Sequence, residues 1–166
     1  MEAFELELPD PEATRRLGQL MGQLLAPGMT IALDGELGTG KTALSKAIVA
    51  QQGQVPEDDV ISPTFVLAAE YPGRVPILHL DAYRLAGPAD LRDLGFELDR
   101  PSARAVLVEW AERVADALPS DRVRVVLDHA PPGRRVNFRG LGPASEAWVE
   151  SLRQLGSSAG FSARAT

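Results

Sequence analysis

The sequence of 166 residues predicts an α/β fold, a three-layer sandwich in which helices flank a mixed, mainly parallel central sheet with an antiparallel hairpin. Three stretches support this prediction. Residues 30–49 combine a short apolar strand, a glycine-rich loop and a helix. Residues 105–108 are wholly apolar, as in a strand that is covered on both faces. Residues 65–80 place two strand-like segments around a Pro-Gly turn, which favours a hairpin.

The glycine-rich loop is residues 35–42, Gly-Glu-Leu-Gly-Thr-Gly-Lys-Thr, and it fits the phosphate-binding pattern G-x-x-x-x-G-K-[ST]. Because a strand precedes it and a helix follows it, the match predicts a fold like that of the P-loop nucleoside triphosphatases. Glycine allows backbone angles that are closed to other residues, so successive N–H groups can point at phosphate oxygens. The predicted ATP-binding residues of this stretch are Gly35, Glu36, Leu37, Gly38, Thr39, Gly40, Lys41, Thr42 and Ala43.

Two side chains at the end of the loop have predicted chemical roles. We expect the Lys41 ammonium to lie between the β- and γ-phosphates and to act in catalysis. The Thr42 hydroxyl is a predicted ligand of Mg²⁺. The helix that begins near Lys41 points the positive end of its dipole at the same phosphates. The predicted cofactors are therefore ATP and Mg²⁺.

The N-terminal elements follow from hydrophobic periodicity and capping residues. Residues 4–8 alternate apolar and acidic side chains, which predicts a half-exposed strand. Asp10 is a predicted helix cap, with Pro11 at the first helical position. The following residues at helical spacing should face the core, and they are Leu17, Leu20, Met21, Leu24 and Leu25.

The C-terminal half predicts further helices and a second pair of strands. Short helices are expected at residues 88–94 and 113–118, strands at 123–127 and 136–138, and a closing helix at 144–155. Residues 156–166 are small and polar, which predicts a disordered tail. We expect residues 1–155 to form a single P-loop ATPase domain.

Composition limits the function classes. The chain has no cysteine, which excludes disulfides and thiolate metal sites. No apolar run is long enough to span a bilayer and no basic-plus-apolar leader is present, so we expect a cytoplasmic protein without a membrane partner. The net charge of −6 argues against strong binding of nucleic acid by this chain alone.

Two acidic residues that end strands are candidates for metal binding and catalysis. Asp81 follows the apolar-rich residues 77–80, and Glu109 follows residues 105–108. P-loop enzymes need a carboxylate at such a position to hold Mg²⁺. Either residue could bind the metal or orient the attacking water, and either could instead be an ordinary strand-end acid in a salt bridge.

Two further groups of side chains are weaker candidates. Ser62 and Thr64 could form a switch that senses the γ-phosphate or the metal, although Ser-Pro before a strand is also ordinary turn chemistry. Arg135 and its neighbour Arg134 are candidates to lie along the adenine or ribose. With Arg84, they are also candidates to stabilise the transferring phosphoryl group.

Four segments together resemble a known family. They are the phosphate loop, Ser62-Pro63-Thr64-Phe65, the H-x-D-x-Y-R-L stretch at 79–85 and the V-E-W-x-E stretch at 108–112. In this order and spacing they are similar to the TsaE (formerly YjeE) family, the bacterial P-loop ATPase of tRNA threonylcarbamoyladenosine biosynthesis. The resemblance spans most of residues 10–140. One departure is Glu36, where the family often has aspartate.

The resemblance implies both roles and partners. It implies that Thr42 and Glu109 hold Mg²⁺, that Lys41 contacts the phosphates, that Asp81 aids hydrolysis, and that residues 62–65 act as a switch. It also implies an ATPase that works with the proteins TsaB and TsaD. Mg²⁺-dependent hydrolysis would reset the complex that modifies the adenosine beside the anticodon. The tRNA would be reached only through that complex.

Three alternatives share the phosphate loop. A small-molecule kinase needs an acceptor pocket and usually a mobile lid, and no long lid is evident in the sequence. A GTPase switch is disfavoured because the chain lacks N-K-x-D, T-K-x-D and D-x-x-G motifs. The third alternative is a nucleotide-gated binding module with negligible turnover.

Overall fold

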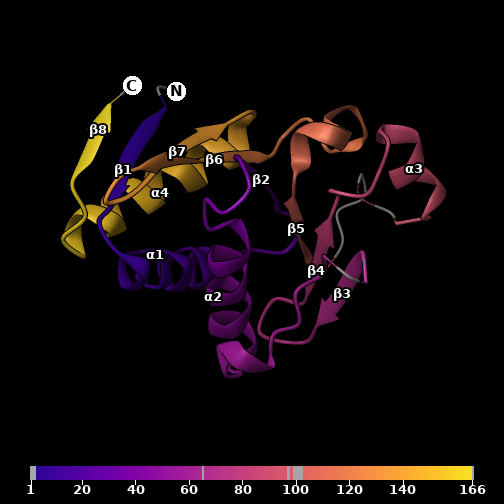
Figure 1. Cartoon of the computed structure of the whole chain (residues 1–166), viewed down its shortest axis with the longest axis horizontal. Helices are drawn as coiled ribbons and strands as arrows, with labels where there is room; N and C mark the ends of the chain where they lie inside the picture. The colour runs from indigo at the N-terminus through magenta and orange to yellow at the C-terminus, as the bar shows by residue number, and fades with distance from the viewer. Residues whose placement is uncertain (1–2, 65, 97, 99–102, 166) are drawn as a thin grey trace.

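The computed structural model describes residues 3–64, 66–96, 98 and 103–165. Within these residues the strands form one sheet in the order β3-β4-β5-β2-β6-β7-β1-β8 (Figure 1). The strands are β1 (Phe4–Leu8), β2 (Thr30–Asp34), β3 (Ala68–Tyr71), β4 (Ile77–Asp81), β5 (Ala105–Glu109), β6 (Val123–Ala130), β7 (Gly133–Gly140) and β8 (Ala163–Ala165).

The sheet is parallel at its centre and antiparallel at both ends. Strands β4, β5, β2 and β6 run parallel to one another. Antiparallel pairing joins β3 to β4 at one end, and β7, β1 and β8 extend the other end. The predicted α/β fold, its mixed sheet and the hairpin of β3 with β4 are thus confirmed, although Phe65 lies outside the described residues. Because parallel strands end at the same edge, the register places Asp81 beside Glu109.

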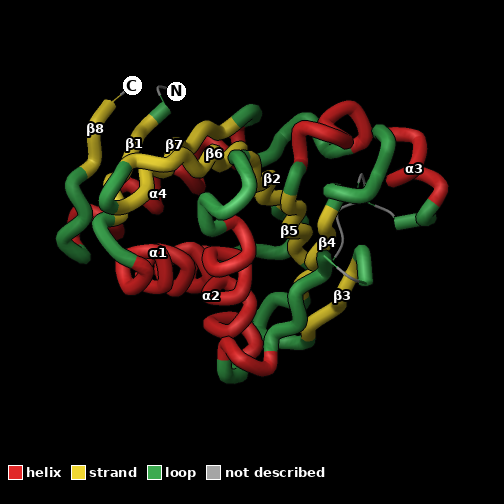
Figure 2. Tube along the Cα trace, in the orientation of Figure 1, coloured by secondary structure: helices red, strands yellow, loops and turns green. Residues whose placement is uncertain are grey.

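Helices α1, α2 and α4 cover most of one face of the sheet, and the other face is covered in part (Figure 2). In the described part of the chain they are α1 (Pro11–Leu24), α2 (Lys41–Gly53), α3 (Pro88–Asp93) and α4 (Pro143–Ser158), with 3₁₀ turns η1 (Glu57–Asp59) and η2 (Ala111–Ala117). None of these helices has the length and hydrophobicity needed to cross a membrane.

The main core lies between the sheet and α1, α2 and α4. Alternate residues of the strands point into it because side chains alternate across a sheet, and they include Ile31, Leu33, Leu107, Val125 and Phe138. The helices contribute Leu17, Met21, Leu44, Ile48 and Leu152, all of them fully buried. Burial of each such side chain is worth about 1.5–3 kcal/mol, so this layer fixes α2 and the loop before it against the sheet.

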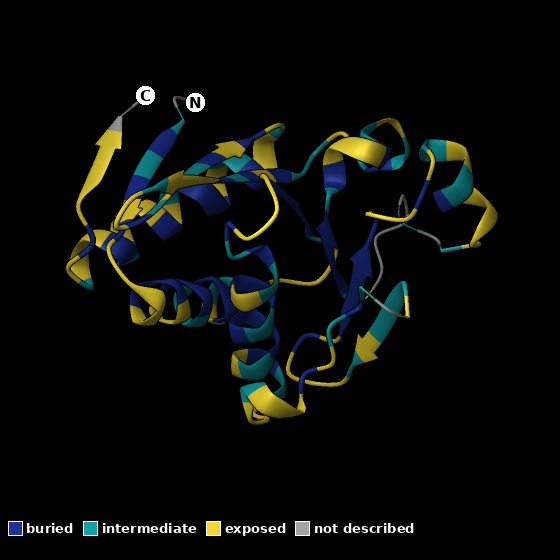
Figure 3. Cartoon of the chain, viewed as in Figure 1, coloured by how far each residue is buried: buried dark blue, intermediate teal, exposed yellow. Residues whose placement is uncertain are grey.

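Among the described residues, the opposite face is covered mainly over β2, β4 and β5. There α3 and η2 pack on a second core that includes Ala32, Leu80 and Val108. On β6 and β7 the same face carries exposed polar side chains. Exposed or half-buried positions largely alternate with buried positions along these two strands, which Figure 3 colours by burial. The exposed positions include Arg124, Asp128, Arg135 and Arg139. The third layer of the sandwich is therefore partial.

The C-terminal residues differ from the expectation of a disordered tail over 156–166. Helix α4 continues to Ser158, and β8 pairs antiparallel with β1. Phe161 lies in the main core, where the Arg16 guanidinium is 5.2 Å from its ring centroid. The physical reason is that β1 leaves a free edge and the core leaves room for one aromatic ring. Both features are formed by distant segments, so the sequence of residues 156–166 alone does not reveal them. Thr166 lies outside the described residues.

Other boundaries shift by a few residues. Strands β6 and β7 are longer than expected, and the helix expected at residues 113–118 is a 3₁₀ turn that begins at Ala111. Asp10 caps α1 as expected, because its Oδ1 accepts a hydrogen bond from the Ala13 N–H at 2.8 Å.

Candidate functional site

The phosphate-type loop joins the carboxyl end of β2 to the amino end of α2. Gly35, Gly38 and Gly40 all have positive φ, at 138°, 79° and 104°. At Gly35 a Cβ would overlap the carbonyl oxygen of Leu127 on β6, so glycine is needed there for space as well as for conformation. The folded loop therefore has the backbone that its sequence pattern predicts.

A pocket of about 300 Å³ lies beside the loop. Residues from the loop, from α2 and from the ends of β4 and β5 line it, and they are Leu37, Gly38, Gly40, Lys41, Thr42, Ala43, Thr64, Asp81, Tyr83, Glu109 and Trp110. The fold thus brings together the predicted catalytic residues, both predicted metal ligands and one of the two switch residues.

Lys41 is held inside the loop. Its Nζ donates hydrogen bonds to the carbonyl oxygens of Gly35 at 2.6 Å and Glu36 at 2.8 Å, and it lies 3.9 Å from the ring centroid of Trp110. Burial lowers the pKa of Lys41, while nearby carboxylates, chiefly Glu109, oppose that effect. The site therefore holds a partly desolvated cation with hydrogen-bond partners that an anion can replace.

Glu109 connects the loop to the core of the sheet. Its Oε2 accepts a hydrogen bond from the Thr42 hydroxyl at 2.8 Å, and its Oε1 lies 2.9 Å from Nε2 of the fully buried His79. The His79 Nδ1 has no hydrogen-bond partner among the described residues. This fits a neutral ring whose Nε2–H donates to Glu109, because a second N–H would be buried without an acceptor.

The carboxylate form of Glu109 is favoured despite its burial. Burial alone would raise its pKa, but the hydrogen bond from His79, with the hydroxyls of Thr42 and Ser45, outweighs that effect and lowers the pKa below the ordinary value. Glu109 is therefore an anion in a nearly dry setting, next to a hydroxyl that can bind a cation.

Asp81 and the two switch residues form a second chain of hydrogen bonds. The Thr64 hydroxyl donates to Asp81 Oδ2 at 2.9 Å, and the Ser62 hydroxyl lies 2.9 Å from that of Thr64. The other carboxylate oxygen of Asp81 accepts from the Tyr83 N–H at 2.8 Å. Asp81 is thus connected by hydrogen bonds to the segment before β3.

The donors present suit Mg²⁺ shared with phosphates better than a metal held by protein alone. No group of three or more histidine, aspartate or glutamate side chains placed to hold a metal occurs within the described residues. The Thr42 hydroxyl and the Glu109 carboxylate supply two hard oxygen ligands at one point. Mg²⁺ is commonly bound by one or two such ligands together with phosphate and water.

Arg135 lies apart from this pocket. Its Nε pairs with Glu5 Oε1 at 3.1 Å on the exposed face of the sheet. The neighbouring Arg134 instead reaches the loop, donating from Nη2 to the Gly38 carbonyl at 3.1 Å. Both arginines line a cavity of about 570 Å³ at the turn between β6 and β7, which shares no lining residue with the phosphate pocket.

Some residues of the site were not anticipated from the sequence. Asp34, the last residue of β2, is buried, and its Oδ1 accepts from the Glu112 N–H at 2.8 Å. The Trp110 ring covers the Lys41 ammonium. The sequence signal for Asp34 was an acid that follows three apolar residues and stands directly before the loop.

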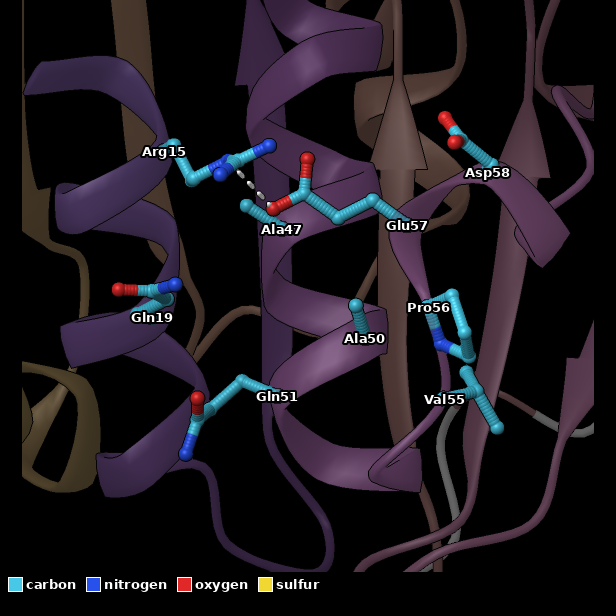
Figure 4. Close-up of a pocket in the computed structure, with 9 residues that line it drawn as sticks. All are labelled: Arg15, Gln19, Ala47, Ala50, Gln51, Val55, Pro56, Glu57 and Asp58. Atoms are coloured by element: carbon cyan, nitrogen blue, oxygen red, sulfur yellow. Dashed lines mark ion pairs between the residues drawn. The ribbon is translucent and has the colours of Figure 1, made fainter. Parts of the chain in front are cut away.

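A separate cavity of about 370 Å³ lies between α1, α2 and η1 (Figure 4). Arg15 on α1 spans it to form an ion pair with Glu57, with 3.0 Å between Nε and Oε1. This cavity shares no lining residue with the phosphate pocket. On α2 it is lined by residues of the later turns, which are Ala47, Ala50 and Gln51. It therefore lacks the glycine loop and the helix N-terminus that favour phosphate.

Comparisons with known proteins agree on one family. The sequence profile described as "Threonylcarbamoyl adenosine biosynthesis protein TsaE" matches residues 8–136. The chain is 31% identical to the tRNA threonylcarbamoyladenosine biosynthesis protein TsaE of Bacillus subtilis (strain 168), covering 92% of this chain and 95% of that one. It is 37% identical to the protein of the same name from Treponema pallidum (strain Nichols), covering 74% and 89%. The crystal structure of YdiB from Bacillus subtilis superposes with a TM-score of 0.72 at 26% identity, covering 92% and 95%.

Proposed function

This chain belongs to the TsaE family of threonylcarbamoyl adenosine biosynthesis proteins, and we propose that it is the ATP-hydrolysing member of the cytoplasmic machinery that makes tRNA threonylcarbamoyladenosine. In this proposal it acts with TsaB and TsaD, and Mg²⁺-dependent hydrolysis resets that complex between cycles. The tRNA is contacted through the partners, which agrees with the net charge of −6.

One observation supports the proposal most directly. The buried Lys41 ammonium, the Thr42 hydroxyl and the Glu109 carboxylate meet in one pocket, with 2.8 Å between the last two groups. A loop of positive-φ glycines and the amino end of α2 complete the anion site. These are the groups that binding and cleavage of a triphosphate require.

The residues of the chain suggest the order of events. Phosphate oxygens replace the carbonyls of Gly35 and Glu36 as hydrogen-bond partners of Lys41. The positive charge of Lys41 then stabilises the negative charge that develops on the leaving phosphates. Mg²⁺, bound by Thr42 and Glu109, would neutralise phosphate charge. Asp81 is placed to accept a hydrogen bond from the attacking water in exchange for the bond that it now accepts from Thr64. That exchange would release Thr64 and Ser62 as the switch.

Arg134 and Arg135 are the candidates to contact the nucleoside end. Both line the cavity at the β6–β7 turn, and the contact of Arg134 with Gly38 connects that cavity to the phosphate loop. For Arg135 to contact the nucleotide, its guanidinium would have to leave Glu5.

The test is ATP hydrolysis by the purified chain, alone and with TsaB and TsaD. We expect Mg²⁺-dependent release of phosphate and its loss in Lys41→Ala, because a charge-assisted contact to phosphate is worth about 1.5–3 kcal/mol, or about 10- to 150-fold in affinity. Lys46→Ala, on the same helix but outside the pocket, is the matched control. Transfer of the phosphate to a metabolite faster than to water would indicate a kinase instead, and tighter binding of GTP than of ATP would indicate a GTPase.

A further inference from the structure

Trp110 has a backbone conformation that needs external support. Its φ of 56° and ψ of 42° lie in the left-handed region, which is unfavourable for a residue with a bulky side chain. Such a conformation persists only where the surroundings determine it. In this position the ring forms the wall of the pocket above Lys41, at 3.9 Å from Nζ.

The chain is held on both sides of Trp110. On the N-terminal side, Glu109 is fixed by Thr42 and His79, and its carbonyl accepts from the Ala82 N–H at 2.9 Å. On the C-terminal side, the Glu112 N–H donates to Asp34 Oδ1 at 2.8 Å. This second contact joins residues that are 78 positions apart in the sequence.

Asp34 is itself fixed and lies at the base of the phosphate loop. It is 6% exposed, and its other oxygen, Oδ2, lies 3.2 Å from Nε of Arg124 on β6. The next two residues in the chain are Gly35 and Glu36, whose carbonyls accept hydrogen bonds from the Lys41 ammonium that the indole ring covers. One carboxylate therefore links the two segments that enclose the ammonium.

We propose that Asp34 is a positioning residue of the ATP site: through the backbone amide of Glu112 it holds Trp110 over Lys41. The ammonium is thereby kept between the ring and the loop carbonyls, ready for phosphate oxygens to replace those carbonyls. The effect that we expect on the rate of hydrolysis rests on the proposed ATP hydrolysis. The effect that we expect on the position of Trp110 does not. Because the donor is a backbone N–H, the side chain at position 112 is not needed for the contact.

The structural consequence can be tested without nucleotide. The chain has two tryptophans, so protein labelled with fluorotryptophan should give two ¹⁹F signals, which Trp148→Phe assigns. Asp34→Ala should shift or broaden the Trp110 signal and leave that of Trp148 unchanged. Asp34→Asn should restore it, because the amide oxygen still accepts from Glu112 and the half-exposed Arg124 can turn to water. Glu112→Ala should leave it in place.

Other results of the same ¹⁹F experiment would overturn the proposal. A Trp110 signal that is unchanged in folded Asp34→Ala would overturn it, and so would a change of equal size in Asp34→Ala and Asp34→Asn. If the alanine variant does not fold, Asp34→Ser is the milder truncation, since its hydroxyl ends one bond short of the carboxylate oxygen. It should move the Trp110 signal in the same direction, and no movement would overturn the proposal.

The kinetic consequence separates positioning from simple support of the fold. We expect Asp34→Ala to lower kcat about tenfold while KM for ATP changes less, because misplacing a group costs most in the transition state. Asp34→Asn should recover most of kcat. If the wild type hydrolyses no ATP, the proposed function fails while the ¹⁹F result still stands. If the wild type is active and Asp34→Ala has the same kcat, the positioning role fails alone.

Discussion

At the scale of single residues, the site depends on a carboxylate that is charged although it is buried. Glu109 is 1% exposed, and its anion is supported by His79, Thr42 and Ser45. Breaking a buried pair by removing one partner usually costs more than the pair contributes. Substitutions at Glu109 must therefore be chosen so that they separate metal binding from folding.

Glu109→Gln makes that separation. Its amide oxygen can still accept from His79 or Thr42, so the fold should persist, whereas the negative charge that attracts Mg²⁺ is lost. We expect the activation free energy of ATP hydrolysis to rise by several kcal/mol at most. The variant should also require more Mg²⁺ for hydrolysis. Titration of hydrolysis with Mg²⁺ measures this, and an unchanged Mg²⁺ dependence would remove Glu109 from the metal role.

Glu112 makes stability depend on pH. Burial, and then the Asp34 carboxylate, raise its pKa from the ordinary 4.5 to about 7. Between these two values the unfolded chain loses a proton that the folded chain keeps, so the folded state loses stability as pH rises from 4.5 to 7. Above pH 7 both states are ionised and the loss is constant.

Glu112→Gln should therefore stabilise the protein at high pH. Because the side chain is largely exposed, solvent screening reduces the expected gain to about 1 kcal/mol at pH 8. At pH 5 most of the gain should be absent, because wild-type Glu112 is then protonated in the fold. Urea unfolding at the two pH values checks this, and an equal gain at both would show that the ionisation of Glu112 is not the cause.

At the scale of elements, close contact between α1 and α2 fixes the direction of the phosphate-loop helix. A Cβ at Gly18 would lie 2.5 Å from the Ala47 Cβ, a distance that packed side chains do not tolerate. The two helices could meet so closely only where one of them lacks a side chain.

Gly18→Ala should thus destabilise the fold by about 1–3 kcal/mol, despite the better helix propensity of alanine. Thermal unfolding measures the change. Gly87→Ala is the matched control, because a Cβ there meets no atom within 4 Å and its φ of 176° suits any residue. Equal stability of Gly18→Ala and wild type would mean that the helices can move apart freely.

The sequence predicts the elements of this site better than it predicts their connections. The phosphate loop is contiguous, and Asp81 and Glu109 end parallel strands, so their meeting at one edge follows from local patterns. The contact of Asp34 with Glu112 and that of Arg134 with Gly38 join distant segments without a local signal. The order of residues 159–165 depends likewise on the free edge of β1 and on the core space that Phe161 fills.

At the scale of the whole molecule, the proposed function requires a surface that partner proteins can contact. The phosphate pocket is open at the tip of the loop, where Leu37 is 78% exposed beside the pocket and Tyr83 is 45% exposed. We expect a partner protein that responds to the bound nucleotide to contact these two side chains. The net charge of −6 agrees with the proposal that this chain reaches tRNA through TsaB and TsaD and does not bind it directly.

The most direct measurement is the number of threonylcarbamoyladenosine residues formed per TsaD molecule in a reaction of purified TsaB, TsaD, tRNA, threonylcarbamoyl donor, ATP and Mg²⁺. With the wild-type chain we expect many modifications per TsaD, and with Lys41→Ala no more than without the chain. Repeated turnover supported equally well by Lys41→Ala, in which the phosphate site is lost, would contradict the account.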